Sequence, residues 1–281
     1  MPELPEVETM CRGIRGVVGQ IIRGASFPRQ TRRPILTSPP TGHLTKRLVG
    51  SRIDAVERAG KRAILRLAGA AADEPERLVI EPRMTGLLLR VPAPSDVHIR
   101  MVLNFADCPP LTFWDRRGLG TIRLLDNEEF SRRCGPTVLG PDALTLTGAA
   151  FYSAIHYSRR PIKQALLDQQ VTAGIGNIYA AEILFAAGLD PRSRCCRISR
   201  AECDAIAKSA RQILRRAIQL EGSSIGDETY RTADSRPGRY QRCHQVYGRA
   251  GVACNRCGVS IRRIVQAQRS TFFCPGCQRR K

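Results

Sequence analysis

The sequence predicts an α+β protein with two domains, a β-rich N-terminal domain and a helical C-terminal domain that ends in a metal-binding hairpin. Between residues 21 and 125, short apolar and β-branched runs alternate with Gly, Pro and charged turns. After residue 147 the apolar runs lengthen and take helical spacing. Two Cys-x-x-Cys pairs follow near the C-terminus. A chain of 281 residues is long enough to build two hydrophobic cores.

A helix is predicted over residues 6–18, because apolar residues recur there at i, i+3, i+4 and i+7. Packing of this helix would fix the two residues that precede it, Pro2 and Glu3. If Met1 is removed, Pro2 becomes a secondary amine, which is partly neutral near pH 7 and can attack an aldehyde-like carbon. Pro2 is therefore a candidate nucleophile. The simpler alternative is a proline that is tolerated at a frayed terminus.

Seven short strands are predicted next, over residues 53–56, 63–67, 78–80, 87–91, 99–103, 111–114 and 122–125. Short strands at this spacing indicate a β-sandwich or a β-barrel. The Gly- and Pro-bearing stretch over residues 134–141 interrupts the pattern. We therefore place the N-terminal domain at residues 1–140.

The helical domain is predicted over residues 141–240, with helices at 151–157, 162–167, 178–187 and 201–220. Gly174 and Gly176 permit a tight turn between two of these helices, and Asn177 stands where an N-cap residue is expected. The free N–H groups of that helix start could bind a phosphate, although an ordinary capped turn explains the same residues. The polar segment 221–238 is too long for a simple connection, which predicts a functional or mobile loop.

The strongest metal signal consists of two cysteine pairs with sixteen residues between them, Cys254, Cys257, Cys274 and Cys277. Four thiolates complete a tetrahedral site and leave no open position, which predicts one structural Zn²⁺ within a segment at residues 241–281. No organic cofactor is expected. Arginines between the pairs suit phosphate contact. The other seven cysteines show no metal spacing. The odd total of eleven cysteines, in a chain of this length, favours a reducing compartment.

Charge narrows the class of partner. The chain carries 45 Lys and Arg against 25 Asp and Glu, a formal net charge of +20, with a pI near 10.3. Such a protein favours a polyanion, and nucleic acid is the leading candidate. We find no run of about 18 apolar residues and no basic-then-apolar leader, so a soluble, intracellular protein without a membrane partner is predicted.

Together these features resemble the bacterial formamidopyrimidine-DNA glycosylase family. The motifs PELPEVET, GxGNIYAxExLFAAG, VYGRxG and CxxC-x16-CxxC occur in the family's order over nearly the whole chain. The resemblance implies a β-sandwich, a helix-two-turn-helix domain and a zinc finger. It also implies a cytoplasmic monomer that binds double-stranded DNA containing an oxidised base or an abasic site.

The implied activity is that of a bifunctional DNA glycosylase and AP lyase of base excision repair, acting on oxidised purines such as 8-oxoguanine and formamidopyrimidines. By resemblance, Pro2 attacks C1′ of the damaged nucleotide and forms a Schiff base that allows β,δ-elimination. Glu3 matches the family's acid/base group. The alternative is that Glu3 is only a carboxylate at a helix start, where it interacts favourably with the helix dipole. Lys61 matches the family's essential lysine, and Arg269 matches the arginine that grips phosphate beside the lesion.

Other residues are assigned to DNA binding by the same resemblance. Asn177 matches a phosphate-binding asparagine, and Arg159 lies near the position of a phosphate-binding lysine, as do Arg160 and Lys163. Met84 matches the wedge that fills the gap left by an everted base. Arg116 matches the arginine that reads the partner base, and Arg117 is expected to contact backbone phosphate.

The chain departs from the family pattern in two places. Glu81-Pro82-Arg83 stands where the family has His-Leu-Gly, and Gly118 occupies the place of a phenylalanine. Leu119 could replace that ring with a one-residue shift, at a loss of stacking worth roughly 1–3 kcal/mol.

Two alternative functions stay open at this point. The first is a sister enzyme for oxidised pyrimidines, although Leu4 favours the purine enzymes because the sisters commonly have glycine there. The second is a catalytically silent DNA-damage-binding protein, which the retention of Pro2, Glu3 and Lys61 disfavours.

Overall fold

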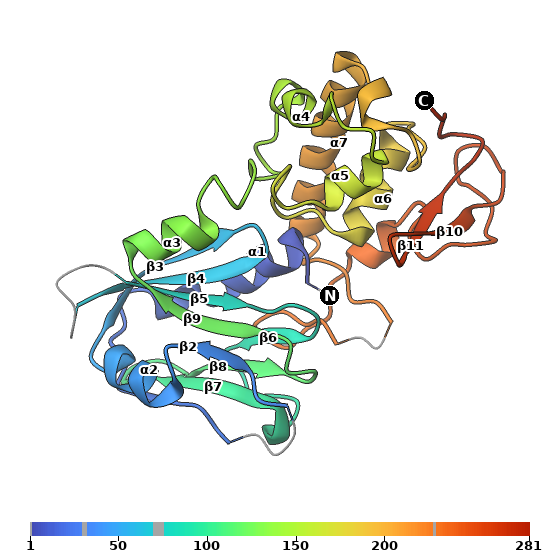
Figure 1. Cartoon of the computed structure of the whole chain (residues 1–281). Helices are drawn as coiled ribbons and strands as arrows, with labels where there is room; N and C mark the ends of the chain where they lie inside the picture. The colour runs from blue at the N-terminus through green and yellow to red at the C-terminus, as the bar shows by residue number, and fades with distance from the viewer. Residues whose placement is uncertain (1, 30–32, 70–75, 227–228) are drawn as a thin grey trace. The chain divides into compact units, whose positions relative to one another are not determined.

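The computed structural model of the chain divides into two compact units, which are described separately. Unit 1 comprises Met1–Gly135 and Leu220–Arg239, and unit 2 comprises Pro136–Gln219 and Tyr240–Lys281. The structure describes residues 2–29, 33–69, 76–226 and 229–281. Figure 1 labels the elements along the chain. The fold is α+β, as predicted.

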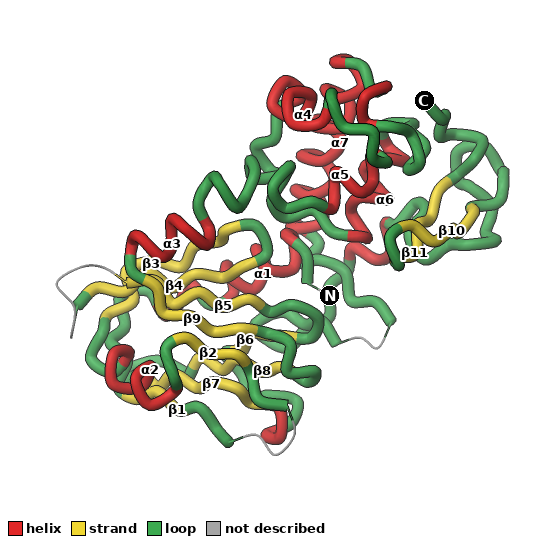
Figure 2. Tube along the Cα trace, in the orientation of Figure 1, coloured by secondary structure: helices red, strands yellow, loops and turns green. Residues whose placement is uncertain are grey.

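Unit 1 is a sandwich of two β-sheets, shown in yellow in Figure 2. Within the described residues, one sheet has the strand order β2-β9-β5-β4-β3 and the other β1-β7-β8-β6. The strands are β1 (Gly24–Ser26), β2 (Leu36–Ser38), β3 (Arg52–Ala59), β4 (Arg62–Ala68), β5 (Glu76–Glu81), β6 (Gly86–Leu89), β7 (Ile99–Asn104), β8 (Leu111–Asp115) and β9 (Thr121–Leu125). Apolar side chains from both sheets share one core, including Leu65, Leu78, Leu88, Met101 and Phe113.

The N-terminal helix α1 (Leu4–Gly13) begins earlier and ends earlier than the sequence pattern suggests. Pro5 suits the first turn, and Glu3 forms a capping box with Glu6, so the helix starts before its apolar stripe. At the other end, a β-carbon on Gly13 would lie 2.6 Å from the β-carbon of Ala233. A short 3₁₀ turn at Arg15–Val17 follows. The buried face of α1 joins the sandwich core through Val7, Met10 and Cys11.

Two short helices were missed by the sequence pattern, α2 (Thr41–Leu48) and α3 (Asn127–Cys134). Both have only eight residues. In α3 the side chain of Asp126 accepts a hydrogen bond from the Glu129 N–H, so a cap and not an apolar stripe defines its start.

Unit 2 contains the helices α4 (Gly148–Ile155), α5 (Ile162–Leu167), α6 (Asn177–Ala186) and α7 (Arg200–Gln219), and the antiparallel hairpin of β10 (Arg262–Gln266) and β11 (Arg269–Phe273). The predicted helices are present. Glu182 on α6 is buried and accepts backbone N–H bonds from Gln245, Val246 and Tyr247. This carboxylate ties the segment before the cysteine hairpin to α6.

The segment Leu220–Arg239 belongs to unit 1, whereas the sequence pattern predicts it within the helical domain. Two backbone contacts to unit 1 account for this. The Ser223 N–H donates to Glu6 Oε1 at 2.8 Å, and the Arg90 N–H donates to the carbonyl of Ala233 at 2.9 Å.

None of the eleven cysteines forms a disulfide. Burial raises the pKa of Cys11 to about 12, which keeps that thiol protonated and unreactive near neutral pH. Among the helices in the described ranges, none is both long and apolar enough to cross a bilayer.

Candidate functional site

Pro2 and Glu3 are held by a buried hydrogen-bond arrangement at the start of α1. Pro2 is buried and Glu3 is 1% exposed. The Glu3 N–H donates to Glu6 Oε2 at 2.9 Å, while Glu6 Oε1 accepts the N–H of Ser223 at 2.8 Å. The carboxylate of Glu6 thus joins the N-terminus to the loop that begins at Leu220. The chain from Pro2 onward is anchored, which removes the frayed-terminus alternative.

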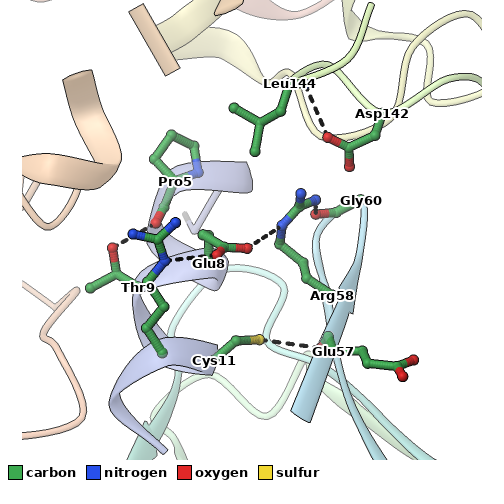
Figure 3. Close-up of polar contacts among 10 residues, drawn as sticks. Pro5, Glu8, Thr9, Cys11, Glu57, Arg58, Gly60, Asp142 and Leu144 are labelled. Carbon is green, nitrogen blue, oxygen red and sulfur yellow. Dashed lines mark hydrogen bonds and ion pairs between the residues drawn. The ribbon is translucent and has the colours of Figure 1, made fainter. Parts of the chain in front are cut away.

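Lys61 lies in the two-residue turn between β3 and β4, where Gly60 has a φ of 57°. Figure 3 shows how Arg58 links this turn to α1. Its guanidinium donates to Glu8 Oε2 at 3.0 Å and to the carbonyl of Gly60 at 2.9 Å. The turn that carries Lys61 is therefore tied to the helix that Pro2 and Glu3 begin.

The electrostatics of Glu8 reinforce this link. Burial alone would raise the pKa of Glu8, but hydrogen bonds from Arg12 and Arg58 outweigh it and hold the pKa below the usual value. The Arg12 bond is an i,i+4 pair on α1 at 2.8 Å. Glu8 is thus ionised at neutral pH and keeps Arg58 in place.

Two exposed turns of unit 1 carry Met84, the predicted wedge, and the two arginines that the resemblance assigns to DNA binding. Met84 lies between β5 and β6, and Arg116 and Arg117 lie between β8 and β9. All three side chains are exposed. The residue before Met84, Arg83, has a φ of 54°, a left-handed conformation uncommon for non-glycine residues.

Asp115 joins the two turns and was not found by sequence reasoning. Its side chain is fully buried and accepts hydrogen bonds from the Thr85 hydroxyl and from the Gly120 N–H, the latter at 2.8 Å. The Arg117 N–H donates to Thr85 Oγ1 at 2.9 Å and to Asp115 Oδ1 at 3.3 Å. The turn of Met84 and the turn of the arginines are thereby fixed to each other.

Gly118 explains why an aromatic ring is missing after the arginine pair. Its φ is 60°, and a β-carbon there would approach the carbonyl oxygen of Arg33 to 2.9 Å. A larger residue does not fit this backbone. Leu119, the next residue, is half-buried.

Replacing Thr85 with Val should lower the free energy of unfolding of unit 1 by about 1–3 kcal/mol. The change keeps the side-chain shape but leaves buried acceptor and donor groups of the Asp115 network unsatisfied. Unfolding in urea, followed by fluorescence of Trp114, the chain's single tryptophan, measures this effect. Thr85→Ser keeps the hydroxyl and serves as the control. A Thr85→Val variant as stable as the parent, with the loss of stability confined to Thr85→Ser, would mean that the methyl group, and not the hydrogen bond, matters.

A second set of site residues lies in unit 2. Lys163 is 1% exposed, and its ammonium donates to Asn177 Oδ1 at 2.7 Å, to Thr271 Oγ1 at 2.7 Å and to the Ser270 carbonyl at 3.1 Å. Asn177 Nδ2 also donates to the Ser270 carbonyl, at 3.0 Å. One lysine thus joins α5, the start of α6 and β11.

The structure changes two details of the sequence interpretation. Gly176 is the N-cap of α6, and Asn177 is its first residue, so the asparagine side chain serves the Lys163 network and not a cap. The basic residue beside Asn177 is Lys163, whereas Arg159 lies exposed after α4. The sequence signal for the role of Lys163 was a charged residue within the apolar helical pattern of residues 162–167.

Arg269 is exposed at the first position of β11. It follows a two-residue turn in which Ala267 and Gln268 have φ values of 46° and 60°. This geometry suits a tight hairpin, although Gly or Asn usually adopts it. Because Ser270 and Thr271 bind Lys163, the hairpin end that carries Arg269 is anchored to the helices.

Replacing Lys163 with Met should loosen the hairpin. The Asn177 and Thr271 side chains would lose a charged donor, at a cost of about 1–3 kcal/mol for each unsatisfied group. Hydrogen exchange of the β10 and β11 amides should accelerate, while α7 stays protected. Lys208→Met, on the exposed surface of α7, is the matched control. Unchanged exchange in the Lys163 variant would contradict the anchoring role.

The four predicted zinc ligands come together. The sulfur atoms of Cys254, Cys257, Cys274 and Cys277 all lie within 4.8 Å of one another. Two of the sulfur pairs are 3.9 and 3.4 Å apart. Tetrahedral zinc with bonds of about 2.3 Å would separate its sulfur ligands by about 3.8 Å, so the donor set fits one structural zinc ion.

Comparisons with known proteins extend over the entire chain. Family models for the formamidopyrimidine-DNA glycosylase N-terminal domain match residues 1–122, and the H2TH domain model of the same family matches residues 139–229. The zinc finger found in FPG and IleRS matches residues 253–280.

Curated relatives and solved structures agree with these models. A formamidopyrimidine-DNA glycosylase of Thermomicrobium roseum is 40% identical, with 99% of each chain covered. One from Cereibacter sphaeroides is 37% identical, covering 99% of this chain and all of the relative.

The MutM (Fpg) protein of Thermus thermophilus has a TM-score of 0.85 and 35% identity, with both chains fully covered. A complex of Lactococcus lactis Fpg with DNA containing an abasic site has a TM-score of 0.86 and 32% identity, covering 99% of this chain and 100% of that one.

Proposed function

The chain belongs to the formamidopyrimidine-DNA glycosylase family, and from this premise we propose that it removes oxidised purines from double-stranded DNA and then cleaves the strand. The observation that carries the proposal is the anchored start of α1. A proline amine would stand beside a buried carboxylate, because Glu6 holds the backbone of Glu3 and the loop at Ser223 together.

The proposed reaction begins at the amine of Pro2, once Met1 has been removed. The nitrogen lone pair attacks C1′ of the damaged nucleotide, the bond from C1′ to the base breaks, and the base leaves with a proton. Opening of the sugar ring gives a Schiff base. Loss of the C2′ proton then expels the 3′ phosphate by β-elimination, and δ-elimination expels the 5′ phosphate. Water finally releases Pro2 from the sugar fragment.

Glu3 is proposed to move the protons of these steps. A carboxylate next to the amine can protonate the sugar oxygen as the ring opens and later accept a proton. Lys61 is proposed to bind a phosphate or to donate a proton. Its turn is fixed to α1 through Arg58 and Glu8, which supports a role near the same chemistry.

DNA contacts are proposed for residues of both units. In unit 1, Met84 would fill the gap left by the everted base, Arg116 would read the partner base and Arg117 would contact phosphate. The Asp115 network supports this division because it fixes the two turns to each other. In unit 2, Asn177, Arg159 and Arg269 would contact phosphates. A net charge of +20 favours all of these contacts.

Excision rates test the substrate class. We expect faster removal of 8-oxoguanine opposite cytosine than opposite adenine, and slower removal of an oxidised pyrimidine. The comparison matters because a related Lactococcus lactis Fpg, 31% identical, has been solved with DNA containing an oxidised pyrimidine. Equal single-turnover rates on the purine and pyrimidine substrates would contradict the purine assignment.

A further inference from the structure

A stack of aromatic rings stands at the C-terminal end of α4 in unit 2. Arg200 lies over the ring of Tyr152, 4.6 Å from its centre. Tyr152 stacks on His156 with centroids 5.0 Å apart and an interplanar angle of 13°. His156 in turn contacts Tyr157, with centroids 3.7 Å apart. We call Arg200, Tyr152, His156 and Tyr157 the α4 stack.

The α4 stack is open at one end. Tyr157 is 89% exposed, the largest value among the exposed large hydrophobic side chains of the described residues. Tyr152 and His156 are only partly exposed, and the Arg200 guanidinium covers the far ring. Packing within the helix accounts for the i,i+4 pair of Tyr152 and His156. It does not account for a tyrosine whose ring is almost wholly in water.

The backbone around Tyr157 brings arginines to the same surface. The Cys196 N–H donates to the Ser158 carbonyl at 2.8 Å, so the segment that contains Arg197 and Arg200 lies beside the residues that follow Tyr157. Arg159, Arg197 and Arg200 are all exposed.

The neighbouring carboxylates do not cancel this charge. Asp168 is paired with Arg160 at 2.8 Å, and Glu202 is paired with Lys281 at 3.1 Å. An excess of positive charge therefore surrounds an exposed aromatic ring.

We propose that the α4 stack binds single-stranded DNA, with an unpaired base stacked on Tyr157 and phosphates held by Arg197 and Arg200. Basic surface combined with exposed aromatic rings is the usual means of binding single strands, because every base offers a π-face and every nucleotide a phosphate. Paired bases in duplex DNA are already stacked on their neighbours, so the ring selects unpaired strands. This site goes beyond the proposed repair reaction and needs neither Pro2 nor the zinc finger.

Binding of a fluorescein-labelled oligothymidylate to the full-length, zinc-loaded protein tests the proposal by anisotropy. Tyr157→Ser should weaken binding roughly 5- to 150-fold, the equivalent of one lost base stack. Tyr157→Phe keeps the ring and should stay within about twofold of the parent. A labelled oligomer of tetrahydrofuran abasic analogues, which offers phosphates without bases and has no aldehyde for Pro2 to attack, should bind the parent and the serine variant equally.

Cleavage of duplex DNA containing 8-oxoguanine, measured on the same preparations, should be unchanged in both variants, because Tyr157 is exposed and has no part in the proposed chemistry. The cleavage assay therefore tests the repair function, and the binding assay tests the α4 stack independently of it. Unchanged oligothymidylate binding by Tyr157→Ser would overturn the proposal, as would an equal loss on the abasic oligomer. Tighter binding of a proline-rich peptide than of oligothymidylate would also overturn it, in favour of a protein partner.

Discussion

Replacing Glu3 with Gln is expected to lower the rate of base excision about 10²- to 10⁴-fold and to leave the stability of unit 1 unchanged. Glutamine retains an acceptor oxygen at the start of α1, and the bond from the backbone N–H of residue 3 to Glu6 does not involve the changed side chain. What the amide cannot do is exchange a proton. Single-turnover rates on duplex DNA containing 8-oxoguanine measure the effect on excision. Urea unfolding, followed by the fluorescence of Trp114, measures the effect on stability.

Glu6→Gln is the matched control for this change. It makes the same carboxylate-to-amide replacement three residues along, at a side chain that is also buried. Because Glu6 accepts two backbone N–H bonds, its variant should lose stability by about 1–3 kcal/mol. If Glu3→Gln keeps full activity, or loses stability as Glu6→Gln does, then Glu3 is only a helix cap.

Removing zinc is expected to unfold the hairpin of β10 and β11 while α7 stays folded. The hydrophobic cluster beneath the hairpin is small and includes two of the zinc ligands, Cys254 and Cys274, among its few buried members. Zinc binding at sites of this type contributes about 10–16 kcal/mol, more than such a cluster provides. Hydrogen exchange before and after chelation, together with zinc content, measures the loss.

Two exposed cysteines offer a matched pair for the same test. Cys257→Ser removes one ligand and should reproduce the effect of chelation, whereas Cys196→Ser removes an exposed thiol outside the cluster and should change nothing. A hairpin that remains protected from exchange without zinc would show that the four cysteines do not hold the structure.

Local patterns in the sequence were sufficient to predict most elements of the fold. The predicted strands are present because short apolar and β-branched runs between turn residues favour strands whatever their distant partners, as in β4 and β5. The four zinc ligands are found together because two short loops fix their spacing. The short helices α2 and α3 were missed because neither carries a long apolar stripe.

The parts of the site that depend on distant contacts were not predictable in this way. Asp115 acts through Thr85, thirty residues away. Lys163 reaches Thr271 across 108 positions. The residues next to Asp115 and Lys163 in the sequence do not indicate which distant residue each one binds, because only the folded chain brings the two partners together. The hydrogen bond from the Ser223 N–H to Glu6 was not predictable for the same reason.

The central claim is that the amine of Pro2 forms the covalent bond to DNA, and borohydride trapping tests it most directly. Protein with Met1 shown to be absent is incubated with duplex DNA containing an abasic site, reduced, digested and sequenced by mass spectrometry. We expect one cross-linked peptide, joined through the nitrogen of Pro2, and no adduct from protein that retains Met1. An adduct on Lys61, or none from protein with a free Pro2, would contradict the account.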